Sequence, residues 1–204
     1  MDRARLEAFS DGVFAVAITL LALNLAVGGP GHGPLIEQLG QHWPTFVAYL
    51  ISFFTIGIIW VNHHGLVRNI TAVDRTLLFL NLVLLLFVVV IPFATATMAE
   101  YLTSGGQDAH IAMALYAGVF EGMSLAFSAI FAWMLGEGRT HRPLPREARA
   151  FAWLRFGFGL FSYLVAIGVA FVSAPAALAI IGLVAVYYMI DPTPAIRRRS
   201  ATDS

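Results

Sequence analysis

An acidic residue near the start of the first hydrophobic stretch is the first candidate for chemistry in this chain. The stretch covers about residues 6–27, and Asp11 stands within it, six residues after Arg5. An ionisable group is expensive to place inside a membrane-spanning helix, so such groups usually face protein or water and serve function. We therefore expect Asp11 to have polar partners on neighbouring helices.

Polar residues in three further hydrophobic stretches lie at a similar distance from an arginine. A pair of histidines precedes Arg68 by four and five residues, an asparagine follows Arg75 by six, and Arg155 follows Arg149 by six. At about 1.5 Å per helical residue, these groups reach nearly the same depth as Asp11. Polar groups in a low dielectric need one another, so we expect Asp11 to pair with one of the histidines. The expected hydrogen-bonded network consists of Ser10, Asp11, Asn62, His63, His64 and Asn81.

The role of the two histidines stays open between a structural network and a proton-sensing or proton-carrying function. Adjacent residues point about 100° apart on a helix, so His63 and His64 do not form a metal clamp, and we expect no metal site. Glu121 stands in the middle of another stretch, between Gly118 and Gly122, whose spacing allows close helix approach. We expect Glu121 to face inward in its protonated form, and a transport carboxylate is the alternative.

The composition is that of an integral membrane protein. Of 204 residues, 59% are hydrophobic and 12% are charged, whereas soluble domains carry roughly a quarter charged residues. The formal net charge is zero, which gives no reason to expect a nucleic acid as partner. The chain has no cysteine, and it carries no esterase, zinc-peptidase or phosphate-loop motif. We therefore expect neither an enzyme nor a bound cofactor.

Six hydrophobic stretches predict an all-α membrane protein, a six-helix bundle that forms a single domain over residues 1–204. A spanning helix needs about 20 mostly apolar residues. The stretches lie at about 6–27, 44–66, 76–100, 110–135, 151–172 and 175–190, and the last is the shortest.

The arginines predict the orientation of these spans. They lie before the first stretch, at 68 and 75, between 139 and 149, and in the tail at 197–199, apart from Arg155. The alternate connections 28–43, 101–109 and 173–174 contain none. Under the positive-inside rule both termini are cytoplasmic. The arginine-rich tail and the 136–149 connection either rest on anionic lipid headgroups or are solvated and only set the topology.

Beyond Asp11, the first stretch carries an apolar stripe with one hydroxyl group. The residues recur at i, i+3, i+4 and i+7 and share one helical face: Val16, Thr19, Leu20 and Leu23. Spacing alone indicates a packing seam. The filter sequence Thr-Val-Gly-Tyr-Gly of ordinary potassium channels does not occur in the chain.

The run Arg5-x-x-x-Phe9-Ser10-Asp11-Gly12-Val13-Phe14-Ala15-Val16 closely resembles the first-helix signature of the transmembrane-protein-175 family. Trp60-x-x-His63-His64 looks like a further family feature. Bacterial members are six-helix relatives of the endolysosomal potassium channel. The resemblance implies a potassium-permeable homotetramer in the bacterial plasma membrane, with one central pore lined by the first helix of each subunit.

The resemblance also implies roles for particular residues. Val16, Thr19, Leu20 and Leu23 line the pore as an apolar gate, which can close by dewetting, and the threonine contributes to selectivity. Arg5 and Phe9 join the polar network, which braces the inner end of the pore helix. Two other functions remain open: a proton-coupled transporter that uses Asp11, His63 or His64 and Glu121, and a membrane assembly protein without conduction.

Overall fold

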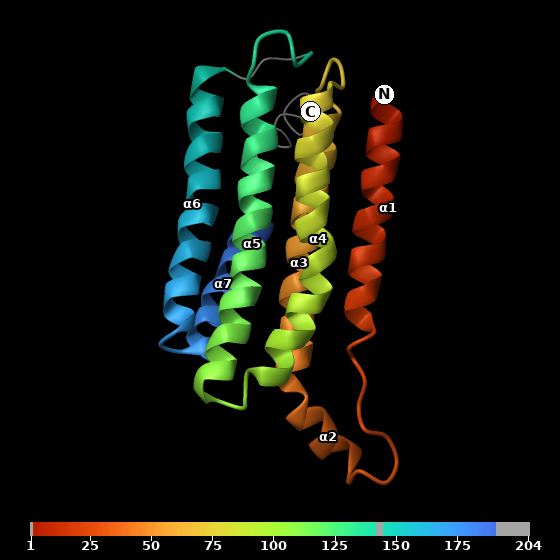
Figure 1. Ribbon diagram of the computed structural model, residues 1–204, viewed down its shortest axis with the longest axis vertical. Helices are drawn as coiled ribbons and strands as arrows, with labels where there is room; N and C mark the ends of the chain where they lie inside the picture. Colours follow the sequence, from red (N-terminus) through yellow and green to blue (C-terminus); the bar gives the residue numbers. More distant parts are fainter. Residues whose placement is uncertain (1, 142–144, 191–204) are drawn as a thin grey trace.

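Seven α-helices form the part of the chain that the computed structural model describes, residues 2–141 and 145–190, without the side chain of Glu147. They are α1 (Arg3–Ala22), α2 (Leu35–Gln41), α3 (Trp43–Val67), α4 (Arg75–Tyr101), α5 (Gly106–Met134), α6 (Arg146–Ala170) and α7 (Ala174–Ile190). All except α2 run side by side in one bundle, and α1 lies at its edge (Figure 1).

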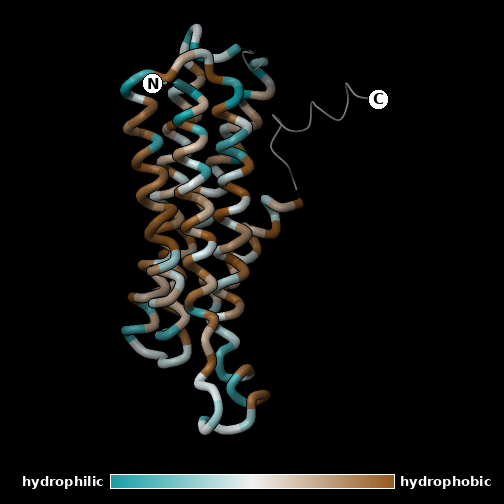
Figure 2. The backbone as a smooth tube through the Cα atoms, turned by 90° about the vertical axis from the view of Figure 1, so that its right-hand side faces the viewer, coloured by the Kyte–Doolittle hydropathy of each residue, from teal (hydrophilic) through white to brown (hydrophobic). Residues whose placement is uncertain are grey.

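Four of the described helices are long and apolar enough to cross a membrane: α3, α4, α5 and α6 from residue 148 onward. The apolar α7 has only 17 residues. α1 does not meet the same criterion, because its 20 residues include Arg3, Arg5, Glu7 and Asp11. Figure 2 shows hydrophobic residues along the middle of the bundle and hydrophilic residues gathered toward its two ends. The chain is therefore an all-helical membrane protein, and a count of six spans stays a prediction.

The first hydrophobic stretch ends as a helix earlier than expected, at Ala22 rather than Val27. The following residues lead into a glycine-rich loop in which Gly29, Gly31 and Gly33 have positive φ, a conformation that glycine adopts without strain. The buried amide of Gln38 binds the backbone of Gly29 and Gly33. Gln38 belongs to α2, a short helix that was not predicted from the sequence. Its side-chain hydrogen bonds hold the glycine-rich loop against α2.

The connections that carry arginine gather at one end of the bundle, which we call the arginine end. The start of α1 and the α3–α4 and α5–α6 connections lie there, whereas α2 and the α4–α5 and α6–α7 connections lie at the opposite end (Figure 1). Two of the arginine-end connections bond to each other: the Thr71 N–H donates to the Arg139 carbonyl at 3.0 Å, and the His141 N–H to the Asn69 carbonyl at 2.9 Å. Arg142 and the arginines at 197–199 lie outside the described residues.

A chain of buried hydroxyl groups links α3, α4 and α5. The Tyr116 hydroxyl lies 2.9 Å from Ser52 Oγ, which lies 2.8 Å from Thr95 Oγ1, and Thr95 donates to the Ile91 carbonyl at 2.7 Å. Since the last donor is fixed, each hydroxyl can donate to the next in that order. Buried polar groups need such partners, so this chain sets the register of the three helices.

The α4–α5 pair approaches closely at Gly122. A Cβ atom at this position would overlap the aromatic ring of Phe87 on α4, whereas one at Gly118 would meet nothing within 4 Å. Of Gly118 and Gly122, therefore, only Gly122 stands where close packing requires a glycine.

The substitution Gly122→Ala should therefore destabilise the protein by about 1–3 kcal/mol, because the added methyl group overpacks the α4–α5 contact. The measurement is thermal unfolding of the purified protein in detergent. Gly118→Ala is the matched control and should leave the unfolding temperature unchanged or slightly raised. Equal stability of the two variants would contradict this packing.

Candidate functional site

α1 buries one face and exposes the other. It packs chiefly on α3 and α4, toward which it turns its buried residues Leu6, Ser10, Phe14, Ala17 and Leu21. The opposite side carries large apolar side chains that are 38% to 74% exposed: Phe9, Val16, Leu20 and Leu23. An exposed apolar face on an edge helix is available to another molecule.

The structure brings the four residues expected to line a pore onto this exposed face. Val16, Leu20 and Leu23 surround Thr19, whose hydroxyl is also exposed and donates to the Val16 carbonyl at 2.8 Å. Leu23 is the residue that caps α1, and its N–H still bonds to the carbonyls of Leu20 and Leu21, so it continues the helical face. We call these four residues the α1 stripe.

A buried cluster fixes α1 to α3 and α4 on the side of the stripe nearer the arginine end. Asn81 of α4 lies at its centre: its Oδ1 is 2.7 Å from His63 Nε2, and its Nδ2 donates to Ser10 Oγ at 3.0 Å. Ser10 in turn donates to the Leu6 carbonyl at 2.9 Å. The His63 ring packs against Phe14, with ring centroids 5.5 Å apart. Ser10, His63 and Asn81 are 1% exposed or less, so the cluster is shielded from solvent.

Three polar contacts run along the α1–α3 interface toward the arginine end. Trp60 Nε1 donates to Asp11 Oδ1 at 2.8 Å, His64 Nδ1 lies 2.8 Å from Glu7 Oε1, and Arg3 Nη1 donates to the Arg68 carbonyl at 3.1 Å. On α1 the contacts fall at residues 3, 7 and 11, and on the antiparallel α3 at 60 and 64 and at Arg68, which caps the helix. Both helices thus use one face at i, i+4 spacing. We call these three contacts the polar ladder.

The expected pairing of Asp11 with a histidine is corrected by this geometry. Asp11 accepts its hydrogen bond from Trp60, His63 turns toward Asn81, and His64 lies opposite Glu7. The reason is the register of the antiparallel helices, which places Trp60, rather than either histidine, beside Asp11. The network therefore divides into a buried cluster and a more exposed ladder.

Asn62, Arg5 and Phe9, which were expected in the network, and Arg155, which was expected only at the same depth, lie elsewhere. Asn62 lines a cavity of about 40 Å³ between α3, α5, α6 and α7. Arg155 lies with its guanidinium 5.0 Å from the ring centroid of Tyr188, whose hydroxyl donates to the Arg155 carbonyl at 2.6 Å. Arg5 and Phe9 are on the exposed side of α1. The single polar layer predicted from depth is thus distributed over separate helix interfaces.

Glu121 is buried on α5, as expected for an inward-facing carboxyl group. It is 8% exposed, and its Oε2 has no hydrogen-bond partner among the described residues. The residue belongs to α5, whereas α1 packs chiefly on α3 and α4. The structure therefore gives no contact between Glu121 and the residues around Asp11 within the described part of the chain.

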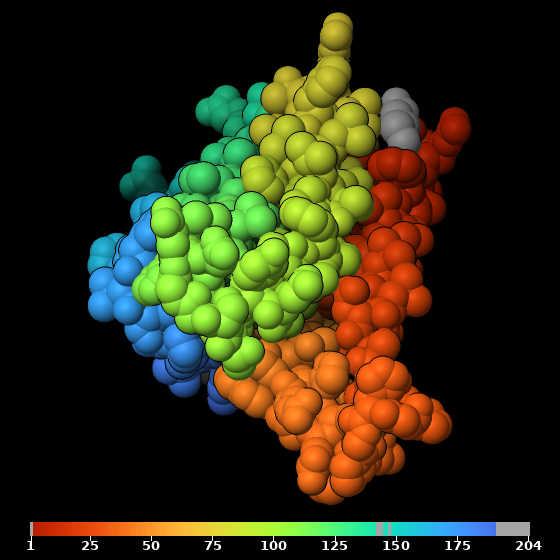
Figure 3. Space-filling view, turned by 60° about the horizontal axis from the view of Figure 1, so that its bottom comes forward, coloured from red at the N-terminus to blue at the C-terminus, as the bar shows by residue number. Residues whose placement is uncertain are grey.

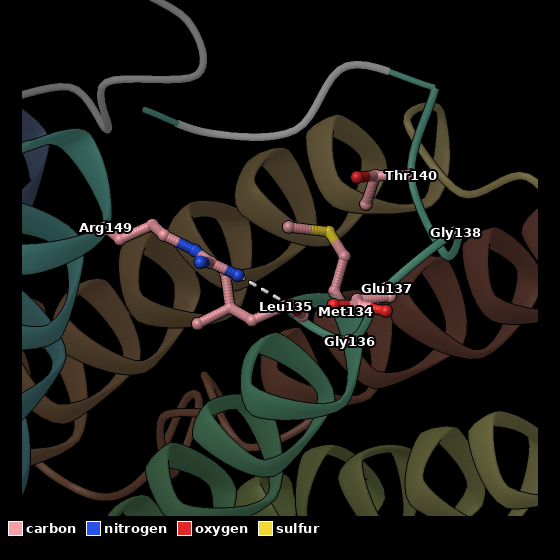
Figure 4. A pocket seen from close by; sticks show the side chains of 7 residues that line it. All are labelled: Met134, Leu135, Gly136, Glu137, Gly138, Thr140 and Arg149. Carbon is pink, nitrogen blue, oxygen red and sulfur yellow. Dashed lines mark hydrogen bonds between the residues drawn. The ribbon is translucent and has the colours of Figure 1, made fainter. Parts of the chain in front are cut away.

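Arg139 of the α5–α6 connection and Arg149 in the first turn of α6 bind the end of α5. A cavity of about 280 Å³ lies beside them, lined by Met134, Leu135, Gly136, Glu137, Gly138, Thr140 and Arg149 (Figure 4). Arg149 Nη2 donates to the Leu135 carbonyl at 2.6 Å, and Arg139 Nη1 donates to the Trp133 carbonyl at 2.8 Å. Arginines commonly satisfy the free carbonyls at helix C-termini. These two side chains therefore have a structural role besides any effect on topology.

Three partners in the ladder were not predicted from the sequence, namely Arg3, Glu7 and Trp60 as a hydrogen-bond donor. A signal was present: the spacing of Glu7 and Asp11 matches that of Trp60 and His64, four residues in each case. When two antiparallel helices each carry two polar residues four positions apart, each residue on one helix can contact one on the other.

Comparison with known proteins identifies several relatives. The family model described as "Endosomal/lysosomal potassium channel TMEM175" matches residues 5–92. A potassium channel of Streptomyces collinus is 43% identical over 100% of this chain and 99% of its own length. An endosomal/lysosomal proton channel of Gallus gallus is 37% identical over 50% of this chain, which corresponds to 22% of that protein.

A solved structure matches the whole bundle. It is a crystal structure of a protein from Chamaesiphon minutus, described as a homologue of the lysosomal potassium-selective channel TMEM175. The two structures agree with a TM-score of 0.80 at 33% sequence identity, over 92% of this chain and 96% of the other.

The space-filling view shows α1 along one side of the molecule rather than enclosed within it (Figure 3).

The substitution Asn81→Leu should destabilise the fold by about 2–4 kcal/mol, because it removes the partner of the buried His63 Nε2 and leaves Ser10 with only its bond to the Leu6 carbonyl. Thermal unfolding in detergent measures this loss. The matched control is Leu82→Ala at the neighbouring position of α4, where the side chain is 48% exposed. If Asn81→Leu were no more destabilising than Leu82→Ala, the buried cluster would not hold α1 in place.

Proposed function

The chain belongs to the TMEM175 family of potassium channels, and we propose that it conducts potassium ions through a pore lined by α1 of each subunit in a homotetramer. The observation that carries this proposal is the α1 stripe. A pore needs a continuous side-chain face that the subunit itself leaves uncovered, and α1 offers one on the side opposite its contacts with α3 and α4.

The stripe has the chemistry of an apolar gate. Around a common axis, Val16, Leu20 and Leu23 form successive rings of branched aliphatic side chains, stacked at helical spacing. A narrow apolar constriction expels water when it closes and admits a hydrated ion when it widens. Neither step needs a carbonyl filter.

Thr19 supplies oxygen atoms within this gate. Its hydroxyl proton is directed to the Val16 carbonyl, so the lone pairs of Oγ1 remain available on the exposed face. A ring of such oxygens can replace part of the hydration shell of a potassium ion. We therefore assign the step that distinguishes ions to Thr19 and the step that blocks them to the leucine rings.

The buried cluster and the polar ladder hold α1 while its other face lines the pore. Ser10, Asn81 and His63 fix α1 from behind, and the ladder fixes it along α3. Asp11 is thus a brace at the inner end of the pore helix and not part of the gate.

The same proposal places the protein in the bacterial plasma membrane with six spans, formed by α1 and α3–α7. Both termini and the arginine end face the cytoplasm, following the positive-inside rule. Arginines at this end are near enough to the membrane surface to attract anionic headgroups. In this arrangement α1 spans as part of an oligomer, where its charged residues are paired on α3 or lie at the cytoplasmic end.

Proton-coupled transport is the second candidate, and the name of the chicken relative, a proton channel, is the finding that points to protons as a permeant ion in a relative. It would need a chain of titratable groups through the membrane. Asp11, His63 and His64 have separate partners on α1, α3 and α4, while Glu121 lies on α5. The described groups give less support to such a relay than to a pore. An assembly protein without conduction is the third candidate.

Potassium flux into liposomes that contain the purified protein separates the three functions. A channel gives a flux that follows the potassium gradient alone, a coupled transporter requires a proton gradient, and an assembly protein gives neither flux. The variant Leu23→Ala should increase potassium flux or admit other cations, because it widens one ring of the gate. Leu86→Ala on α4, 60% exposed and outside the stripe, is the matched control. A flux that Leu23→Ala leaves unchanged would remove this residue from the pore.

The pair of variants Thr19→Val and Thr19→Ser tests the assignment of ion discrimination. Valine keeps the shape of threonine and removes the hydroxyl, so the preference for potassium over sodium should fall by about tenfold, equivalent to about 1.4 kcal/mol. Serine keeps the oxygen and should retain most of the preference. Reversal potentials with the two cations on opposite sides provide the measurement. Equal selectivity in the two variants would show that the hydroxyl does not discriminate.

A further inference from the structure

The face of α3 opposite the polar ladder lines a cavity. At helical spacing Thr55, Ile59 and Asn62 share one face, and the ladder residues Trp60 and His64 lie on the other. The cavity lies between α3, α5, α6 and α7 and has a volume of about 40 Å³. Bound molecules commonly occupy such places between the helices of a bundle. The helix that carries the ladder therefore has a candidate binding site behind it.

Two of the hydroxyl-bearing residues that line this cavity lack a partner. Tyr163 of α6 is only 4% exposed, and neither its hydroxyl nor that of Ser124 on α5 forms a hydrogen bond within the described part of the chain. A buried hydroxyl group without a partner is costly. Thr55 is 3% exposed and donates to the Ile51 carbonyl at 2.7 Å, so its oxygen can still accept. The cavity thus presents both donors and acceptors.

The polar groups are spread along the cavity, and apolar walls lie between them. Thr55 and Asn62 are seven residues apart, about 10 Å along α3. Both line the cavity, which therefore extends along the helix. Phe127 and Phe156 supply aromatic walls, with ring centroids 5.5 Å apart. An apolar occupant would leave the hydroxyl groups unsatisfied, whereas water both donates and accepts.

The volume and the charge of the cavity restrict what it can hold. A single water molecule needs about 10–15 Å³ of cavity volume, so this cavity has room for two or three. A lipid chain is too large for it. None of its lining residues carries a charge, so a bound ion would lack a counter-charge.

We infer that this cavity is a binding site for two or three ordered water molecules, which hydrogen-bond α3 to α5 and α6. The hydroxyl groups of Tyr163 and Ser124 donate to these waters, and Thr55 accepts. Buried waters of this kind are part of a structure and costly to remove. They support α3 on the side opposite α1 and so add to the attachment of the helix that carries the ladder. The site is independent of conduction through the proposed pore.

The test is X-ray radiolysis of the purified full chain in detergent, followed by mass spectrometry. Irradiated water yields hydroxyl radicals, which oxidise a neighbouring methionine to its sulfoxide. Met123 lines the cavity and is 1% exposed, whereas Met113 on the same helix is 0% exposed and lines neither of the two cavities described above. Bulk solvent reaches neither, so Met123 should react about fivefold faster because of the bound water. Equal rates would show a dry cavity and overturn the inference.

The pair of variants Ser124→Val and Ser128→Val tests the position of the water. Valine at 124 removes a hydroxyl group and fills part of the cavity, so the Met123 rate should fall toward that of Met113. Ser128 is 7% exposed on the same helix and does not line the cavity, so Ser128→Val should keep the wild-type rate. If Ser124→Val left the Met123 rate at the wild-type level, the radicals would come from water elsewhere and the site would be refuted.

A high-resolution density map of the unaltered full chain provides a second measurement. Two or three separate peaks are expected within hydrogen-bonding distance of the hydroxyl groups of Tyr163, Ser124 and Thr55. A map without such peaks, or with the continuous density of an acyl chain, would contradict the water site. Potassium flux decides the proposed function separately, so either conclusion can fail while the other stands.

Discussion

The structure depends on one constraint: the polar side chains on the first half of α1 must find partners, because burial without them is costly. Ser10 meets this need through Asn81 of α4, and Glu7 and Asp11 meet it through α3. These contacts decide which face of α1 turns inward. The apolar stripe is exposed as a consequence, since it lies on the opposite side of the same helix.

The other helices of the bundle hold α1 in position. α4 and α5 pack closely at Gly122, where a Cβ atom would overlap the Phe87 ring, and the hydroxyl chain from Tyr116 to Ile91 fixes α3, α4 and α5 together. α3 and α4 are therefore held from one side by this core and offer their other side to α1. A rigid support and an edge helix with a free face suit a protein in which one helix from each copy meets the others.

Residue types and spacing predicted much of this arrangement, but not the pairing. The hydrophobic stretches located the long helices, and i, i+4 spacing placed Val16, Thr19, Leu20 and Leu23 on one face. The depth counted along the helices predicted that Asp11 lies near the histidines, but it did not predict which side chain Asp11 contacts. Register decided it: Asp11 lies beside Trp60, and His64 beside Glu7. A shift of one helical turn between two antiparallel helices changes every such pair, and hydropathy carries no record of that shift. The early end of α1 at Ala22 was equally hidden, because Leu23 to Val27 are still mostly apolar.

The unequal attachment of α1 along its length has a mechanical consequence. Polar bonds concentrate between Arg3 and Asp11, while the segment from Thr19 to Leu23 has apolar neighbours and leads into a glycine-rich loop. The second half of α1 is held by the apolar packing of Phe14, Ala17 and Leu21 alone, which is less directional than the hydrogen bonds of the first half, so a small tilt turns about the bonded end. Leu23 lies about 18 Å beyond Asp11 along the helix axis, so a tilt of only about 5° carries it sideways by about 1.6 Å. Rotations too small to break one of these bonds can thus shift the exposed face of α1 at its far end, and with it the width of the proposed pore.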